Sequence, residues 1–152
     1  MAGSLRGGDK MMRALRDIER KIGNGAAVRV GFLEGSTYPD GTPVPLVAAA
    51  NEFGDPRRNR PPRAFFRTMI ADKSPGWGVK FAGVLKATDY NLKLSLSYMG
   101  EGITSQLRQS ILDFTDPPLA DSTIARKGFD KPLIDKSVML NSASFEVVDG
   151  PA

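Results

Sequence analysis

Five arginines lie within eleven residues and form the only dense cluster of charge in the sequence: Arg57, Arg58, Arg60, Arg63 and Arg67. Three prolines stand among them, at positions 56, 61 and 62. Proline fixes its own backbone angle, restricts the residue before it and removes an N–H donor. We therefore expect a shaped loop that holds positive charge away from the core. Guanidinium groups in such a loop can pair with carboxylates or with phosphates.

Two interpretations of the arginine cluster follow from these chemistries. Nucleic-acid-binding domains usually concentrate positive charge on one face, and residues 57–67 would be that face here. The formal net charge of the chain is only +4, which is modest for 152 residues. A charge run is more often solvated or paired than used to read nucleic acid. We therefore favour pairing with carboxylates of a neighbouring subunit and keep a nucleic-acid-binding module as the alternative.

Catalysis is not expected from the residue types that the chain offers. The sequence has no histidine and no cysteine, so Ser-His, Cys-His and cysteine-ligated zinc chemistries are excluded. A metal-dependent nuclease needs only carboxylates and a lysine, and Asp40 could begin such a site. The acidic-x-Lys pattern that should follow on a later strand is missing, because Glu19-Arg20-Lys21 precedes Asp40 and falls in a helical pattern. We expect no enzyme activity, no metal and no cofactor.

Length and composition predict a single domain covering residues 1–152, which is long enough to bury a core. Met1 to Gly8 is rich in glycine, and we expect it to form a flexible N-terminal arm. No apolar run approaches the roughly 18 residues of a membrane-spanning helix. The first ten residues also lack the hydrophobic centre of a secretory signal. We therefore expect a protein that is made and kept in a cytoplasm, without membrane contact.

Hydrophobic periodicity predicts the elements that hold the arginine cluster. Apolar residues spaced by three and four indicate a helix from Asp9 to Ile22, and alternation indicates a strand around Val28–Phe32. A helix over Pro43–Phe53 should begin at a Thr42 cap and end at Gly54. A further helix should open at Pro62, and another should start near Ser74. The longest pattern runs from Leu92 to Phe114.

The end of the chain supplies the second predicted strand. Asp116-Pro117-Pro118 should stop the long helix, and Gly100 and Gly102 within it indicate a kink or a close crossing. Short helical turns are expected near 122–128 and 135–140, with a short extended piece over 131–134. Ser144–Val148 alternates as a terminal strand. The order of elements predicts an α+β fold, in which N- and C-terminal strands form a small antiparallel sheet packed against several helices.

Two motifs in this framework resemble a known family. Asn51-Glu52-Phe53-Gly54, followed after the basic loop by Pro61-Pro62-Arg63-Ala64-Phe65-Phe66-Arg67, resembles the EFG … PPRPFxR signature of small neck and tail-completion proteins of long-tailed bacteriophages. Ala64 replaces the usual proline. Lys131-Pro132-Leu133-Ile134-Asp135, with Met139, Asn141 and Ser142 behind it, resembles the PLIDTGxLxxS stretch of the same proteins and of related virion-morphogenesis proteins. Here Lys136-Ser137 stands where that family has Thr-Gly.

The resemblance implies structural work. Proteins of this family form homo-oligomeric rings at the head-proximal end of the tail, where they close the tail tube or join it to the head connector. It implies a virion location after assembly in the host bacterial cytoplasm, with neck, connector and tail-tube proteins as neighbours. On this view the arginine cluster either docks on acidic groups of a neighbour, such as those near Asp113 and Asp116, or faces the channel through which genomic DNA passes. The N-terminal arm would become ordered on assembly.

Overall fold

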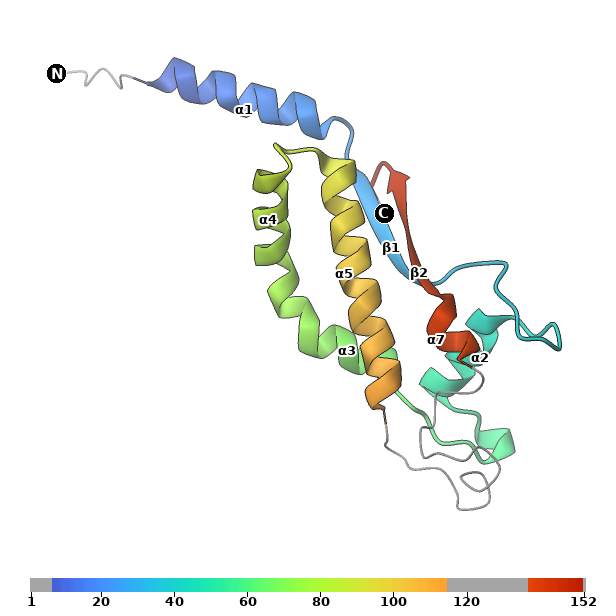
Figure 1. Cartoon of the computed structure of the whole chain (residues 1–152). Helices are drawn as coiled ribbons and strands as arrows, with labels where there is room; N and C mark the ends of the chain where they lie inside the picture. The colour runs from blue at the N-terminus through green and yellow to red at the C-terminus, as the bar shows by residue number, and fades with distance from the viewer. Residues whose placement is uncertain (1–6, 115–136, 152) are drawn as a thin grey trace.

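The computed structural model describes residues 7–114 and 137–151. Figure 1 shows an elongated molecule in which one long helix runs beside a two-stranded sheet. In chain order the elements are α1 (Gly8–Ile22), β1 (Ala26–Phe32), α2 (Val44–Phe53), α3 (Phe65–Lys73), α4 (Trp77–Ala87), α5 (Leu92–Asp113), α7 (Val138–Ser142) and β2 (Ala143–Asp149). Short 3₁₀ turns at Pro56–Arg58 and Ser74–Gly76 join α2 to α3 and α3 to α4.

The sheet pairs the two ends of the chain, as the sequence predicts. β1 and β2 run antiparallel, with Ala26 opposite Asp149 at one end and Phe32 opposite Ala143 at the other. Between them the chain makes its helices, so the fold is α+β. A two-stranded sheet is marginal by itself in water and needs packing on a helix. α5 supplies that packing, because it contacts both strands.

The approach of α5 to β2 depends on a missing side chain. A Cβ atom placed on Gly100 would lie 2.3 Å from the Phe145 ring, so the helix can lie this close to the strand only with glycine there. The predicted close crossing at Gly100 is therefore confirmed, and α5 continues through both glycines without a break. Gly102 has a different environment, since a Cβ there would meet no atom within 4 Å.

The core lies at the end of α5 that is remote from α1. Its buried residues come from α2, α3, α5, α7 and β2: Val44, Ala48, Phe65, Met69, Leu107, Ile111, Met139 and Ala143. Phe32 of β1 meets Phe65 edge-on, with ring centroids 6.2 Å apart. Trp77 packs against this cluster and donates an Nε1 hydrogen bond to Gln106 Oε1 over 2.9 Å. The core thus fixes α2 and α3, between which the arginine cluster lies.

Several predicted boundaries differ in the structure. α2 begins at Val44 after Pro43 with no side-chain cap, so the cap predicted at Thr42 is wrong. α3 begins at Phe65 and not at Pro62, because the two prolines continue the loop. α1 already begins at Gly8, which shortens the predicted arm, and residues 1–6 lie outside the described part of the chain. The turns predicted at 122–128 and the extended piece at 131–134 also lie outside it.

Candidate protein-interaction site

The first motif is built around the buried carboxylate of Glu52. This side chain lies in the last turn of α2 and is only 5 % exposed. Its oxygens accept backbone N–H groups from Phe66 (3.0 Å) and Arg67 (3.1 Å), which lie in the first turn of α3. Ala64, which precedes α3, makes no side-chain cap. The first N–H groups of a helix have no partner within the helix, so Glu52 caps α3 from a distance and complements its dipole.

Arg67 strengthens the same joint between α2 and α3. Its Nε donates to Glu52 Oε1 over 2.7 Å, and a second guanidinium nitrogen donates to the Glu52 carbonyl over 3.1 Å. The guanidinium also lies 5.2 Å from the ring centroid of Phe53. Of the five arginines in the cluster, Arg67 is therefore already engaged by the motif itself. It positions the loop and is the least available for a partner.

Gly54 lets the chain between the two helices fold back tightly. Its φ of 76° is in the left-handed region that favours glycine. A Cβ atom at this position would lie 2.7 Å from Pro62 N and 2.9 Å from the Arg60 carbonyl oxygen. Both are backbone atoms, which cannot move aside cheaply. The turn between α2 and the Pro-Pro pair thus needs glycine on steric grounds.

The arginine loop itself is closed by its own backbone. Asp55 and Arg60 exchange two hydrogen bonds, from Asp55 N to Arg60 O (2.9 Å) and from Arg60 N to Asp55 O (3.0 Å). The Asp55 carboxylate accepts the Arg57 N–H and lies 3.6 Å from Arg58 Nε. Asn59 takes the left-handed conformation that turns the chain back. The result is a short rigid loop, residues 55–60, with exposed arginines at its tip.

The charges of this loop are only partly neutralised within the described residues. Arg57 and Arg60 are exposed and form no ion pair with any residue of 7–114 or 137–151. Arg63 is half-buried, and its Nε is a buried donor without a hydrogen-bond partner. Burial, followed by the neighbouring charge of Arg60, lowers the pKa of the Arg63 guanidinium. Unneutralised cations held close together favour an anionic partner.

Only part of the second motif lies in the described chain, and that part packs beside the first motif. Asn51 accepts the Arg63 N–H at its carbonyl (2.6 Å), which ties the end of α2 to the Pro-Pro segment. Phe66 is partly buried against the core, whereas Pro61 and Pro62 are exposed. From the second motif, Met139 is buried in the core beside α2, and Ser142 donates to the Val138 carbonyl at the end of α7. Lys131, Pro132, Leu133, Ile134 and Asp135 lie outside the described residues.

Sequence reasoning missed how this loop is held. Glu52 was expected only as a motif residue, although it caps α3 across fourteen positions of sequence. Asp55 was not singled out, although its carboxylate and backbone close the loop. A signal for Asp55 was present, because Asp-Pro commonly initiates a turn. No such signal indicated the role of Glu52, since local sequence cannot reveal a cap that comes from another helix.

No group of three or more Asp or Glu side chains within residues 7–114 and 137–151 could hold a metal ion. Searching the helices of the described chain for one that is long and apolar enough to cross a membrane finds none. Comparisons with known protein families, curated proteins and solved structures found no match to this chain. What the site offers chemically is a rigid cationic loop on a capped helix pair.

Proposed function

We propose that this chain is a structural virion protein of a tailed phage, which forms a homo-oligomeric ring at the neck or the head-proximal end of the tail. In this role it completes the tail or joins it to the head and contacts connector and tail-tube proteins. It works by shape and contact without catalysis. The proposal is supported by the resemblance of both motifs to neck and tail-completion proteins and by what the first motif does structurally.

One observation carries the proposal. The motif residues Glu52, Gly54 and Arg67 all serve to fix one loop, and that loop displays Arg57, Arg58 and Arg60 to its surroundings. Preorganising charged side chains reduces the entropy lost on binding and is typical of a docking element. Because Arg57 and Arg60 lack acidic partners in the described chain, the surface that they meet should be acidic. In a ring this surface belongs to a neighbouring subunit or to an adjoining protein.

The unpaired charge of the loop also supports a second function, which is non-specific contact with DNA. Arginines that line a channel can neutralise phosphates of passing DNA without reading its sequence. Such binding weakens steeply as salt rises, because each neutralised phosphate releases counterions. Retention of the protein on double-stranded DNA that falls with salt would support this alternative. Indifference to DNA at low salt would exclude it.

The test is charge reversal of the exposed loop arginines. Arg57→Glu with Arg60→Glu should abolish ring formation, or docking on isolated tails or heads, while the fold persists. Arg29→Glu with Lys73→Glu changes the net charge equally at two exposed positions outside the loop and outside α1, α4 and α5, and serves as the control. Oligomer mass by sedimentation and ring shape by electron microscopy give the readout. Normal rings from the loop variant would remove the loop from the interface, and turnover of a substrate by the wild-type protein would overturn the structural role.

A further inference from the structure

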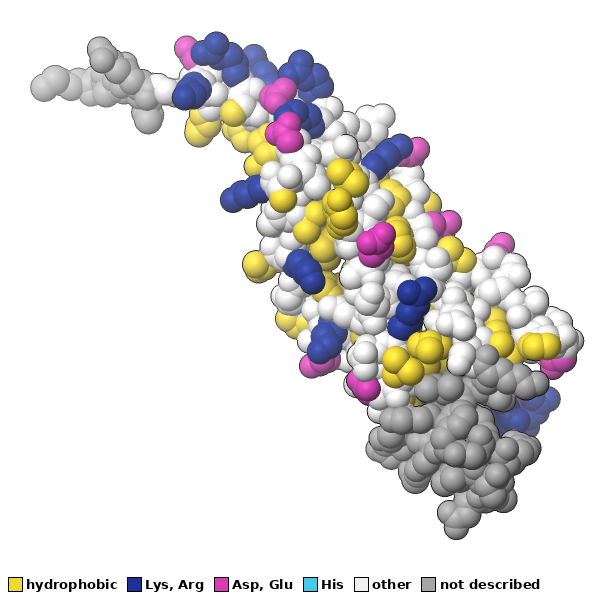
Figure 2. All heavy atoms as spheres, viewed as in Figure 1, with side chains coloured by type: hydrophobic (Ala, Val, Ile, Leu, Met, Phe, Trp, Pro, Cys, Tyr) yellow, Lys and Arg dark blue, Asp and Glu magenta, His cyan; other side chains and the backbone are white. Residues whose placement is uncertain are grey.

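α1 has an apolar face that nothing in the described chain covers. The helix has no buried residue, and Met11, Leu15 and Ile22 remain 62 %, 51 % and 36 % exposed. Figure 2 shows hydrophobic side chains along one side of α1 and basic side chains along the other. A helix of 15 residues is marginal in water unless its apolar face is packed. The exposed apolar face of α1 is thus typical of a helix that packs against another protein surface.

The base of α1 is tied to its own subunit while the rest projects away. Lys21 Nζ lies 2.7 Å from an Asp89 oxygen in the turn between α4 and α5, and 3.2 Å from Asp17 on α1. These partners, Asp89 first, raise the pKa of Lys21. Figure 1 shows the helix leaving the body from this point, with its N-terminal end away from every other element. The N-terminal part of α1 thus stands away from α4 and α5 of its own chain (Figure 1).

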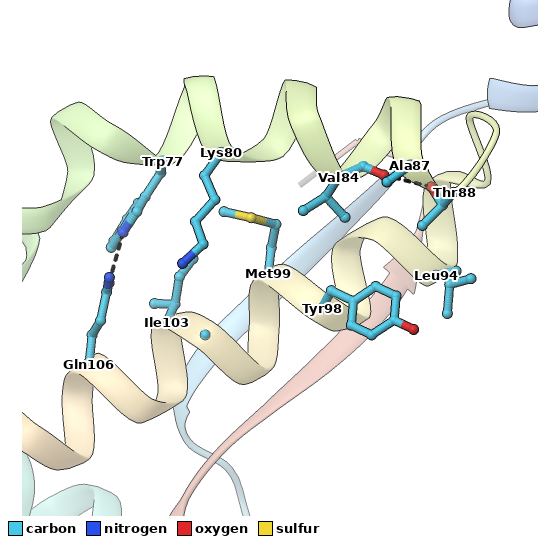
Figure 3. A pocket seen from close by; sticks show the side chains of 11 residues that line it. Trp77, Lys80, Val84, Ala87, Thr88, Leu94, Tyr98, Met99, Ile103 and Gln106 are labelled. Atoms are coloured by element: carbon cyan, nitrogen blue, oxygen red, sulfur yellow. Dashed lines mark hydrogen bonds between the residues drawn. The ribbon is translucent and has the colours of Figure 1, made fainter.

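A groove of about 510 Å³ lies between α4 and α5, and it is lined mainly by apolar side chains with Lys80 on its α4 wall. Figure 3 shows side chains of both helices bordering it, with the Trp77–Gln106 hydrogen bond at one end and Thr88 at the other. Leu94 and Tyr98 on its α5 side are 43 % and 54 % exposed. Gly102 leaves an opening in the same wall, since a Cβ there would meet nothing within 4 Å.

The groove and the apolar face of α1 match in length. At 1.5 Å per helical residue the wall from Leu94 to Gln106 is about 18 Å long, and the stripe from Met11 to Ile22 is about 16 Å long. The stripe consists of Met11, Leu15, Ile18 and Ile22, which recur at helical spacing on one face of α1.

We propose that α1 of one copy docks its apolar face in the α4–α5 groove of a second copy. The contact joins two different surfaces, so repeating it around an axis builds the proposed ring. A dimer in which two copies exchange α1 reciprocally would keep the contact but overturn its role in the ring. This inference deepens the proposed ring and rests on the same assumption of self-assembly. It names the second subunit contact, which is separate from the arginine loop and apolar in character.

The size of the contact sets how strong it is. A helix about 22 Å long and about 10 Å wide that buries half its surface removes on the order of 700 Å² from both partners together. Stable pairwise interfaces bury about 1,200–2,000 Å², so two isolated copies should associate weakly. In a closed ring every subunit makes the contact twice, and the closing step occurs within one assembly. Oligomers should therefore appear cooperatively as protein concentration rises, with few dimers.

Site-directed cross-linking tests the contact directly, because the chain has no native cysteine. Leu15→Cys is placed in one preparation and Gly102→Cys in another that carries a mass tag. The two are mixed at high concentration under mild oxidation. Val79→Cys, on α4 outside the groove and 82 % exposed, replaces Gly102→Cys in the control. We expect cross-linked heterodimers from the 15–102 pair at least tenfold in excess of those from the 15–79 pair.

The outcomes separate this contact from the ring itself. A Leu15→Cys, Gly102→Cys double variant should give covalent oligomers, whereas a cross-linked monomer alone would mean that α1 occupies the groove of its own chain and would overturn the proposal. Rings that form without the 15–102 cross-link would overturn the α1 contact but leave the ring. A protein that stays monomeric at every concentration, and on its partners, would overturn both. Leu15→Glu should also lower the oligomer fraction at least tenfold. We expect this variant to fold normally, because α1 contains no buried residue.

Discussion

Replacing Glu52 should destabilise the protein, because its carboxylate joins α2 to α3. Its carboxylate caps two N–H groups of α3 and pairs with the Arg67 side chain, all from a position that is 5 % exposed. Removing it leaves two partly buried backbone donors without partners and one guanidinium without its carboxylate. The perturbation is Glu52→Ala, with Glu52→Gln as the variant that keeps the shape but loses the charge.

The magnitude depends on which of the two interactions dominates. A hydrogen bond to a charged group contributes about 1.5–3 kcal/mol, and there are two from the backbone of α3. The Arg67 side chain is 56 % exposed, so solvent screens its ion pair to about 1 kcal/mol or less. We therefore expect Glu52→Ala to cost about 3–5 kcal/mol, Glu52→Gln about 2 kcal/mol and Arg67→Ala about 1 kcal/mol. The cap should outweigh the ion pair.

Urea unfolding followed by circular dichroism measures these differences as shifts in the free energy of unfolding. Glu101→Ala, an exposed glutamate in the middle of α5, should change this free energy by no more than about 0.5 kcal/mol and is the control. Equal costs for Arg67→Ala and Glu52→Ala would show that the ion pair holds the two helices together. A cost below about 1 kcal/mol for Glu52→Ala would refute the capping role altogether.

Two further predictions concern the frame around the site. Gly100→Ala should lower the free energy of unfolding in urea by about 1–3 kcal/mol, because its Cβ meets Phe145. Gly102→Ala should raise it by about 0.5–1 kcal/mol, because the added methyl enters open space in the same helix. A change of the same sign for both variants would contradict the close crossing. The contacts at the base of α1 should be insensitive to pH through neutrality. Arg20, then Lys21, lower the pKa of Asp17 from 3.8, so its contribution is present above 3.8 and is lost as pH falls through the lower value in the folded protein. Lys21 has its pKa raised from 10.5, so its contribution is present below 10.5 and is lost only as pH rises through the higher value. Hydrogen exchange of α1 should therefore show protection that falls at the acid and alkaline ends only, and a midpoint near pH 7 would contradict this assignment.

The fold was predictable because its signals are local and strong. The alternation in β1 and β2 and the apolar stripe of α5 over six turns each indicate a face that must be buried. The two strands found in residues 7–114 and 137–151 lie near opposite ends of the chain, so they pair with each other. Gly100 and Gly102 also indicated a kink or a close crossing, because a glycine in the middle of a long helix costs stability unless another element packs closely against it. These features follow from periodicity and need no knowledge of tertiary contacts.

The candidate site was only partly predictable, for a physical reason. Composition located the arginines, but whether each one is free or paired depends on residues distant in sequence. Arg67 is paired because Glu52 reaches it from α2, and Arg63 is half-buried because Asn51 holds its backbone. The exposed stripe of α1 has the same periodicity as a stripe that packs in a core, so periodicity could not show that it lacks a partner within the described chain.

The placement of the two candidate contacts restricts the kind of assembly. Figure 1 shows α1 at one end of the molecule and the turn at Pro56–Arg58 at the other. A twofold contact through the loop would place Arg57 and Arg60 of one copy against the same unpaired charges of another, which like-charge repulsion opposes. On the proposals above, the loop meets a different, acidic surface, and α1 meets a different, apolar one. Two contacts that both join unlike surfaces can be repeated from subunit to subunit, which generates rings or stacks, whereas a twofold dimer would require the two copies to exchange α1 reciprocally.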